Sequence, residues 1–176
     1  MNYSSMAVFC GSKSGTNPKF ETHARTLGNL LAERGIELIY GGGNKGLMGA
    51  VADAALGRGG KVTGIIPKIL TEWEHQHDAL TELIVVEDMH IRKHLLYQKC
   101  DAAIILPGGY GTLDELFEVL TWNQLKIHSK PIFLLNTDGF YDSLLDHIRN
   151  MEAEQFLYTR LEETITIVNE PAQIFD

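Results

Sequence analysis

The chain alternates short apolar runs with longer amphipathic segments, and this order limits the possible folds more than any other feature of the sequence. The runs with strand character lie at residues 6–10, 36–40, 61–66, 83–86, 102–106, 131–135 and 164–168. The segments with helical character lie at residues 18–34, 47–56, 89–99, 112–125 and 141–152. Strands that alternate with helices are typical of βαβ units. The sequence therefore predicts an α/β protein whose central sheet is mostly parallel.

The composition is that of one soluble globular domain. A hydrophobic content of 44% and a charged content of 22% are ordinary for this class. No internal repeat, linker or low-complexity tract divides the chain, so residues 1–176 are predicted to form a single domain. The N-terminal residues lack the basic segment and apolar run of a signal peptide, and no apolar stretch approaches the roughly 20 residues that span a bilayer.

Charge and cysteine usage narrow the partners and the compartment. The formal net charge of −8 argues against a broad electrostatic surface for nucleic acid, which needs clustered Lys and Arg. A small anionic ligand stays possible because it needs only a few donors inside a cleft. Cys10 and Cys100 lie far apart and outside any metal-ligand spacing, so they are predicted to be reduced thiols. These features favour a cytoplasmic protein that binds a small molecule.

Three loops rich in glycine follow three of the predicted strands. They lie at residues 11–15, 41–46 and 108–111. Ligands of open parallel sheets bind beyond the carboxyl ends of the strands. The clustering of these loops therefore predicts where the functional site lies.

The second loop matches the pattern G-x-G-x-x-G between a strand and a helix. A dinucleotide site would also need an acidic residue about 20 positions further on. Residues 63–67 contain none, so an NAD site is disfavoured. Two interpretations stay open for Gly42 and Gly43: close approach of the backbone to a phosphate or sugar, or a tight turn that needs positive φ.

The third loop is more specific. Gly108, Gly109 and Gly111 expose backbone amides where a helix is predicted to begin, and these amides together with the helix dipole attract an anion. The loop lacks the Gly-Lys-Ser/Thr of a Walker A motif, so ATP hydrolysis is not implied. Thr112 can cap the helix or donate its hydroxyl to a phosphate. Glu115 completes a possible capping box with Thr112 or else faces the cleft.

Two adjacent cations, Arg92 and Lys93, lie at the start of the preceding helix. This position is unfavourable for cations because the helix dipole prefers anions there. A site that binds an anionic nucleotide would explain the placement. The alternative is that at least one of the two is a solvated surface charge, and Lys93 fits this alternative better than Arg92.

Two histidine pairs have spacings that a metal could use. His90 and His94 lie four positions apart, and His75 and His77 lie two positions apart. No matching carboxylate or cysteine motif accompanies either pair. No metal site is therefore predicted.

These motifs resemble those of one known family. Met89-x-x-Arg92-Lys93, followed after a strand by Pro-Gly-Gly-Tyr-Gly-Thr-x-x-Glu at residues 107–115, is similar to the LOG ("Lonely Guy") family. Its members are cytokinin riboside 5′-monophosphate phosphoribohydrolases that were long mislabelled as lysine decarboxylases. The similarity runs from residues 9–12 through residues 41–43 to residues 120–125, which is nearly the whole chain.

The resemblance implies a Rossmann-like, three-layer fold, a homodimer, and no metal or organic cofactor. It implies that residues 109–112 hold a 5′-phosphate and that Arg92 and Glu115 are the catalytic pair at the ribose. Asp114 stands where many members carry a second glutamate, which keeps the charge. The substrate-binding residues that we predict are Ser12, Gly42, Gly43, Glu74, Met89, Lys93, Gly108, Gly109, Tyr110, Gly111, Thr112 and Thr121.

The implied activity is hydrolysis of the N-glycosidic bond of adenosine 5′-monophosphates, including N6-modified ones, to the free base and ribose 5-phosphate. Two alternatives stay open: an AMP nucleosidase of housekeeping type, and a non-catalytic protein that binds or carries a nucleotide or the molybdenum cofactor. Lysine decarboxylation is disfavoured because a pyridoxal enzyme needs a Schiff-base lysine and a partner for the ring nitrogen. No residue here is marked for either role.

Overall fold

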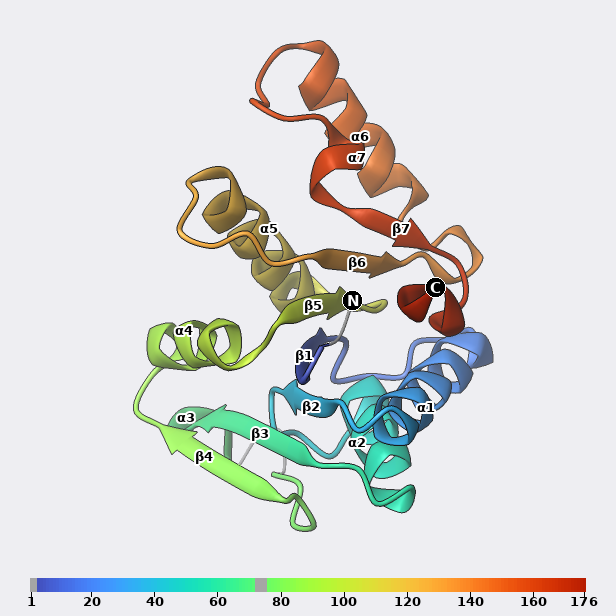
Figure 1. The fold of residues 1–176 in the computed structure, drawn as a ribbon, viewed down its shortest axis with the longest axis vertical. Helices are drawn as coiled ribbons and strands as arrows, with labels where there is room; N and C mark the ends of the chain where they lie inside the picture. The colour runs from blue at the N-terminus through green and yellow to red at the C-terminus, as the bar shows by residue number, and fades with distance from the viewer. Residues whose placement is uncertain (1–2, 72–75) are drawn as a thin grey trace.

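The central sheet is parallel throughout the described part of the chain. The structure is a computed structural model that describes residues 3–71 and 76–176. Its seven strands follow the order β4-β3-β2-β1-β5-β6-β7, from the bottom to the top of Figure 1. They are β1 (Ser5–Phe9), β2 (Glu37–Tyr40), β3 (Val62–Pro67), β4 (Glu82–Val86), β5 (Ala102–Ile105), β6 (Ile132–Leu135) and β7 (Thr166–Val168). Every neighbouring pair of strands is parallel, which confirms the predicted α/β class.

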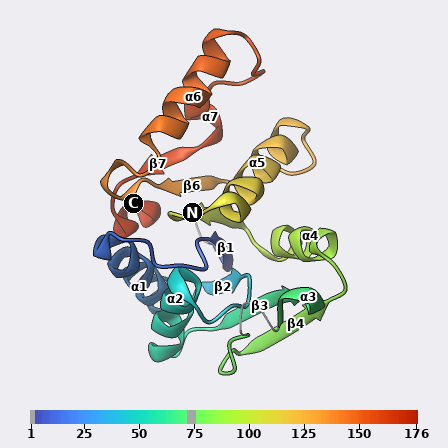
Figure 2. The same cartoon turned by 180° about the vertical axis from the view of Figure 1, so that it is seen from behind.

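Helices cover both faces of this sheet, as the two opposite views in Figures 1 and 2 show. The α-helices are α1 (Pro18–Glu33), α2 (Gly46–Gly57), α3 (Lys68–Thr71), α4 (Met89–Lys99), α5 (Tyr110–Gln124), α6 (Asp142–Ala153) and α7 (Leu161–Thr164). The 3₁₀ helices are η1 (Thr137–Gly139) and η2 (Pro171–Phe175). The sequence did not predict α3 or α7, and because α7 ends at Thr164, the last strand begins two residues later than expected.

The core is divided between the two faces because successive side chains of a strand point to opposite sides. Met6 and Val8 of β1 belong to the core that contains residues of α1 and α2, whereas Ala7 and Phe9 belong to the core that contains residues of α4, α5 and α6. All four are at most 3% exposed, as a strand buried on both faces requires. Two apolar cores on opposite faces of one sheet confirm the three-layer arrangement.

Successive strands are added to the sheet first on one side of β1 and then, from β5 onward, on its other side. It moves outward from β1 through β2 and β3 to β4, then returns to place β5 on the other side of β1. Such a switch point leaves a crevice beyond the carboxyl ends of the two strands. Here the chain ends of both strands are tied together: Leu106 N–H donates to Phe9 O at 2.9 Å, and Gly11 N–H donates to Pro107 O at 3.0 Å. The first and third glycine loops therefore lie side by side.

Within residues 3–71 and 76–176, no helix is both long enough and apolar enough to cross a bilayer.

Candidate active site

A cavity of about 380 Å³ lies at the switch point, over the carboxyl ends of β1 and β5. Its walls come from the loop after β1, the end of β2, the first turns of α4 and α5, and α2 and α3. Its lining residues are Val8, Phe9, Cys10, Gly11, Ser12, Gly41, Met48, Leu70, Met89, Arg92, Gly109, Tyr110, Gly111, Thr112, Asp114 and Glu115. The structure thus brings both predicted catalytic residues, Arg92 and Glu115, to the same cavity as residues 109–112.

The N-terminus of α5 lies at the cavity. The helix begins at Tyr110 with Gly109 as its N-cap, so the N-cap residue has no side chain to accept from the first amides, and no acidic residue lies in the first turn. These amides are the usual binding groups for anions at a helix start. Of the two roles left open for Thr112 and Glu115, the capping box does not fit the structure, because the helix starts two residues earlier than expected and both residues lie inside it, lining the cavity.

Gly108 holds this helix start against the first loop. A Cβ atom built on Gly108 would lie 2.1 Å from Thr112 Oγ1 and 3.0 Å from the backbone nitrogen of Gly11. Gly109 and Gly111 differ, because a Cβ on either would meet no atom within 4 Å. Gly108 is therefore needed for packing, and it lines a second cavity of about 250 Å³ rather than the first one. Gly109 and Gly111 face open space at the helix start.

Arg92 is held at the cavity wall by main-chain oxygens. Its side chain is 5% exposed; Nε donates to Ile65 O at 3.1 Å and Nη2 donates to Gly41 O at 3.2 Å. The guanidinium packs against Gly41, where a Cβ would lie 2.1 Å from Nη2. Asp88 caps α4 by accepting from His90 N–H at 2.8 Å, which stabilises the helix that carries Arg92. Of the glycines at 41–43, Gly41 is thus the one that supports the site.

Lys93 is not the solvated surface charge that the sequence suggested. Its ammonium pairs with Asp114 at 2.9 Å and Glu118 at 3.4 Å on α5, and its side chain is 14% exposed. Burial lowers the pKa of Lys93, but the two carboxylates outweigh burial, and its pKa lies above the ordinary value. Lys93 is absent from the cavity lining, so it links α4 to α5 in this structure.

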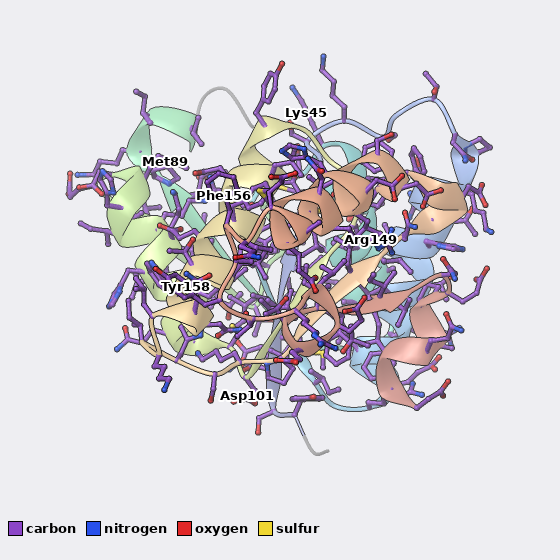
Figure 3. The ribbon with its side chains drawn as sticks, turned by 90° about the horizontal axis from the view of Figure 1, so that it is seen from above. Lys45, Met89, Asp101, Arg149, Phe156 and Tyr158 are labelled. Atoms are coloured by element: carbon purple, nitrogen blue, oxygen red, sulfur yellow. The ribbon has the colours of Figure 1, made fainter. Side chains whose placement is uncertain are left out.

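The remaining predicted site residues divide into two groups. Ser12, Met89 and Tyr110 line the cavity; Met89 lies in the first turn of α4 (Figure 3), and Tyr110 is 95% exposed. Thr121 lies on the outer part of α5, where its hydroxyl donates to Phe117 O at 2.7 Å, and it lines a separate apolar groove. Glu74 lies outside the described residues.

Of the two interpretations left open for Gly42 and Gly43, the structure shows the turn with positive φ at Gly42. Gly42 has a φ of +80°, its carbonyl accepts from His77 N–H at 3.0 Å, and a Cβ there would lie 3.3 Å from Ile66 Cβ. Gly43 forms an isolated bridge with Gln76. Both glycines are buried and neither lines the cavity, so they shape the turn rather than touch the space that a ligand would fill.

The described histidines do not assemble a metal site. Among the described residues, no group of three His, Cys, Asp or Glu side chains is arranged to hold a metal ion. His77 pairs instead with Asp53, at 2.9 Å from Nε2 to Oδ1, and accepts from Ala79 N–H through Nδ1 at 3.2 Å. His75 lies outside the described residues.

Sequence reasoning did not single out several residues that line the cavity. Met48, Leu70 and Cys10 are among them. Cys10 directly precedes the first glycine loop, so its place was within reach of the strand pattern. Met48 and Leu70 carried no such signal, because ordinary apolar residues of helices are far more often buried in a core.

The fold and the cavity define a class: a Rossmann-like α/β protein with a glycine-rich helix start and a buried arginine at the switch point of its sheet. Comparison with known proteins narrows this class. The family model described as "possible lysine decarboxylase" matches residues 48–176. Cytokinin riboside 5′-monophosphate phosphoribohydrolase LOG7 of Arabidopsis thaliana is 51% identical over 152 residues, which are 86% of this chain and 70% of the relative. LOG3 of the same plant is 48% identical over 160 residues, which are 91% of this chain and 74% of the relative.

The chain therefore belongs to the LOG family, as its motifs indicated. Solved structures agree on the fold. The molybdenum cofactor binding protein of Rippkaea orientalis aligns with a TM-score of 0.73 and 26% identity over 99% of this chain and 94% of that chain. The molybdenum cofactor carrier protein of Chlamydomonas reinhardtii aligns with a TM-score of 0.74 over 97% of this chain and 92% of that chain; at 20% identity it supports the fold alone.

Proposed function

We propose that the protein hydrolyses the N-glycosidic bond of adenosine 5′-monophosphates, including N6-modified ones, and releases the free base and ribose 5-phosphate. The observation that carries this proposal is the single cavity that combines the open start of α5 with Arg92 and Glu115. Relatives named for this activity are about half identical to the chain. The net charge of −8 supports a small-molecule partner rather than nucleic acid.

The reaction adds water across the bond between the ribose and the base. Cleavage of this bond leaves positive charge on the sugar, as in other glycosidic hydrolyses with an oxocarbenium-like transition state. In our proposal, the carboxylate of Glu115 lies beside the sugar and stabilises this charge electrostatically. It also accepts a proton from the attacking water, whose hydroxyl joins the ribose while the base leaves with the bonding electron pair and takes up a proton.

Arg92 has a different role because arginine stays protonated in proteins and does not act as a base. Its guanidinium is fixed by two main-chain carbonyls, of Ile65 and Gly41, and is therefore pre-organised before substrate arrives. We assign it the positioning of the nucleotide and stabilisation of the negative charge that develops on the departing base.

The phosphate provides binding energy at a distance from the bond that breaks. We assign it to the amides of residues 109–112, which line the cavity on the same helix as Glu115. Such remote binding energy orients the reacting centre. A nucleoside without phosphate should therefore react poorly.

The test is an assay of the purified protein with AMP, N6-isopentenyladenosine monophosphate and adenosine, followed by detection of free base and ribose 5-phosphate. We expect turnover of at least one monophosphate and a kcat/KM for adenosine at least about 100-fold lower than for AMP. Preference for AMP over the isopentenyl compound would favour the housekeeping nucleosidase. Retention of a nucleotide or of the molybdenum cofactor without product would contradict the enzyme and support the carrier.

We also propose a homodimer in the cytoplasm. Thr121 lies outside the cavity of its own chain. If Thr121 contacts the nucleotide, as the family resemblance implies, it would therefore do so in the cavity of a second subunit. Phe156 and Tyr158, which follow α6, are 77% and 87% exposed and could be covered by such a partner (Figure 3). Cys10 and Cys100 are buried and form no disulfide, which supports a reducing compartment. Light scattering should give twice the chain mass, and a monomer at micromolar concentration would exclude the dimer.

A further inference from the structure

Helix α4 carries two sets of contacts on different sides. Arg92 contacts the ends of β2 and β3, whereas Lys93 and Tyr97 contact α5. Lys93 and Tyr97 are four residues apart, so they lie on the same side of the helix. The same two turns of α4 therefore fix Arg92 at the cavity and connect to the helix that carries Glu115.

The hydroxyl of Tyr97 donates a hydrogen bond to the main-chain carbonyl of Glu115, with an O···O distance of 3.0 Å. A helical carbonyl has two lone pairs, so it can accept this bond in addition to its bond within the helix. Tyr97 is 2% exposed, and burial raises the pKa of its hydroxyl above the ordinary value. The hydroxyl therefore remains protonated and serves as a donor at every pH at which the protein would be assayed.

The ring of Tyr97 is held on several sides, so the hydroxyl has a defined position. Its centroid lies 5.0 Å from that of Trp122 on α5, and the ring stacks on His128 at 5.5 Å. On its other side Phe9 lies 5.6 Å away, and Phe9 lines the cavity. Tyr97 thus connects a wall residue of the cavity with the turn of α5 that carries Glu115.

We propose that Tyr97 is a positioning residue, whose hydroxyl sets the place of the Glu115 turn relative to α4 and so the separation of Glu115 from Arg92. This inference rests on the proposed function for its catalytic consequence. Misplacement of a catalytic group by about 1 Å can cost about 100-fold in rate, so one hydrogen bond to its backbone is enough to matter. Tyr97 itself does not line the cavity and is not assigned any contact with substrate.

The test is Tyr97→Phe, which removes the hydroxyl and keeps the ring. We expect kcat for the nucleotide monophosphate to fall about tenfold while KM changes less than about twofold. We expect KM to change less than kcat because other contacts hold the loop that we assign to the phosphate. Gly11 N–H donates to Pro107 O, and Gly108 packs on Thr112. A kcat equal to that of the native protein would overturn the proposal, and so would a loss confined to KM.

Tyr40→Phe is the matched control. Tyr40 is also fully buried, but its hydroxyl has no hydrogen-bond partner among the described residues, and it does not line the cavity. Its removal should leave kcat and KM unchanged and the melting temperature equal or higher. A fall in kcat as large as that of Tyr97→Phe would mean that any change in buried tyrosines slows the enzyme, and the specific role of Tyr97 would be lost.

A crystal structure of Tyr97→Phe separates the failure of this inference from the failure of the proposed function. If the native protein turns over none of the nucleotides, the proposed function fails but the positioning role is still tested. We expect the turn of Glu115 and its carboxylate to move relative to α4 in the variant. Unchanged positions of Glu115 and Arg92 would overturn the inference whatever the activity.

Discussion

Replacement of Glu115 with glutamine should lower kcat about 1000-fold, because it removes the negative charge beside the sugar and the acceptor for the water proton together. The amide has nearly the same shape as the carboxylate, so packing is preserved. Since α5 begins at Tyr110 with Gly109 as its N-cap, Glu115 has no capping role to lose, and the melting temperature should stay within a few degrees of the native value. Steady-state kinetics and thermal melts by circular dichroism measure both quantities.

Glu154→Gln is a suitable control for this variant. It changes the net charge by the same amount, but Glu154 is exposed at the end of α6 and does not line the cavity. Its kcat should equal that of the native protein. If Glu115→Gln retained activity and melted early, Glu115 would be a structural residue and the proposed chemistry would be wrong.

Replacement of Gly111 or Gly109 with alanine should raise KM for the monophosphate by roughly 10- to 100-fold, because a methyl group would enter the space assigned to the phosphate. Neither methyl meets a protein atom within 4 Å, so the fold should tolerate both changes. Gly111 lies within α5, where alanine is favoured over glycine by roughly 0.5–1 kcal/mol. The Gly111→Ala variant is therefore expected to melt at the native temperature or above it while binding nucleotide less tightly.

Gly108→Ala provides the contrast. Its Cβ would lie 2.1 Å from Thr112 Oγ1, so the helix start and the first loop must separate. We expect a loss of about 1–3 kcal/mol in the free energy of unfolding together with the loss of activity. Native affinity for nucleotide in both Gly109→Ala and Gly111→Ala would rule out the amides of residues 109–112 as the phosphate site. Binding is measured by calorimetry with AMP.

The strand and helix order could be predicted from the sequence because it follows from local periodicity. The start of α5 could not. Thr112 offers the usual side-chain signal of a cap, whereas the real N-cap, Gly109, has no side chain to give one. The sequence therefore left two roles open for Glu115, that of a helix cap and that of a cavity residue. Only the observed start of α5 excludes the capping role.

Contacts between helices could not be predicted from the sequence either. The pairing of Lys93 with Asp114 and Glu118, and the bond from Tyr97 to the Glu115 carbonyl, depend on how α4 and α5 meet above the sheet. The sequence did indicate Gly41, Gly42 and Gly43 as one loop, but not that Gly41 would accept from Arg92 while Gly42 adopts positive φ. Each of these assignments needs the tertiary arrangement.

The absence of a side-chain cap at the start of α5 has a consequence for titration. Peptide N–H groups neither gain nor lose protons between pH 5 and 9, so an anchor built from them has a constant strength over that range. The second ionisation of a phosphate monoester occurs near pH 6. If the affinity for the 5′-phosphate changes across neutral pH, the change would then reflect the ionisation of the nucleotide and not that of the protein.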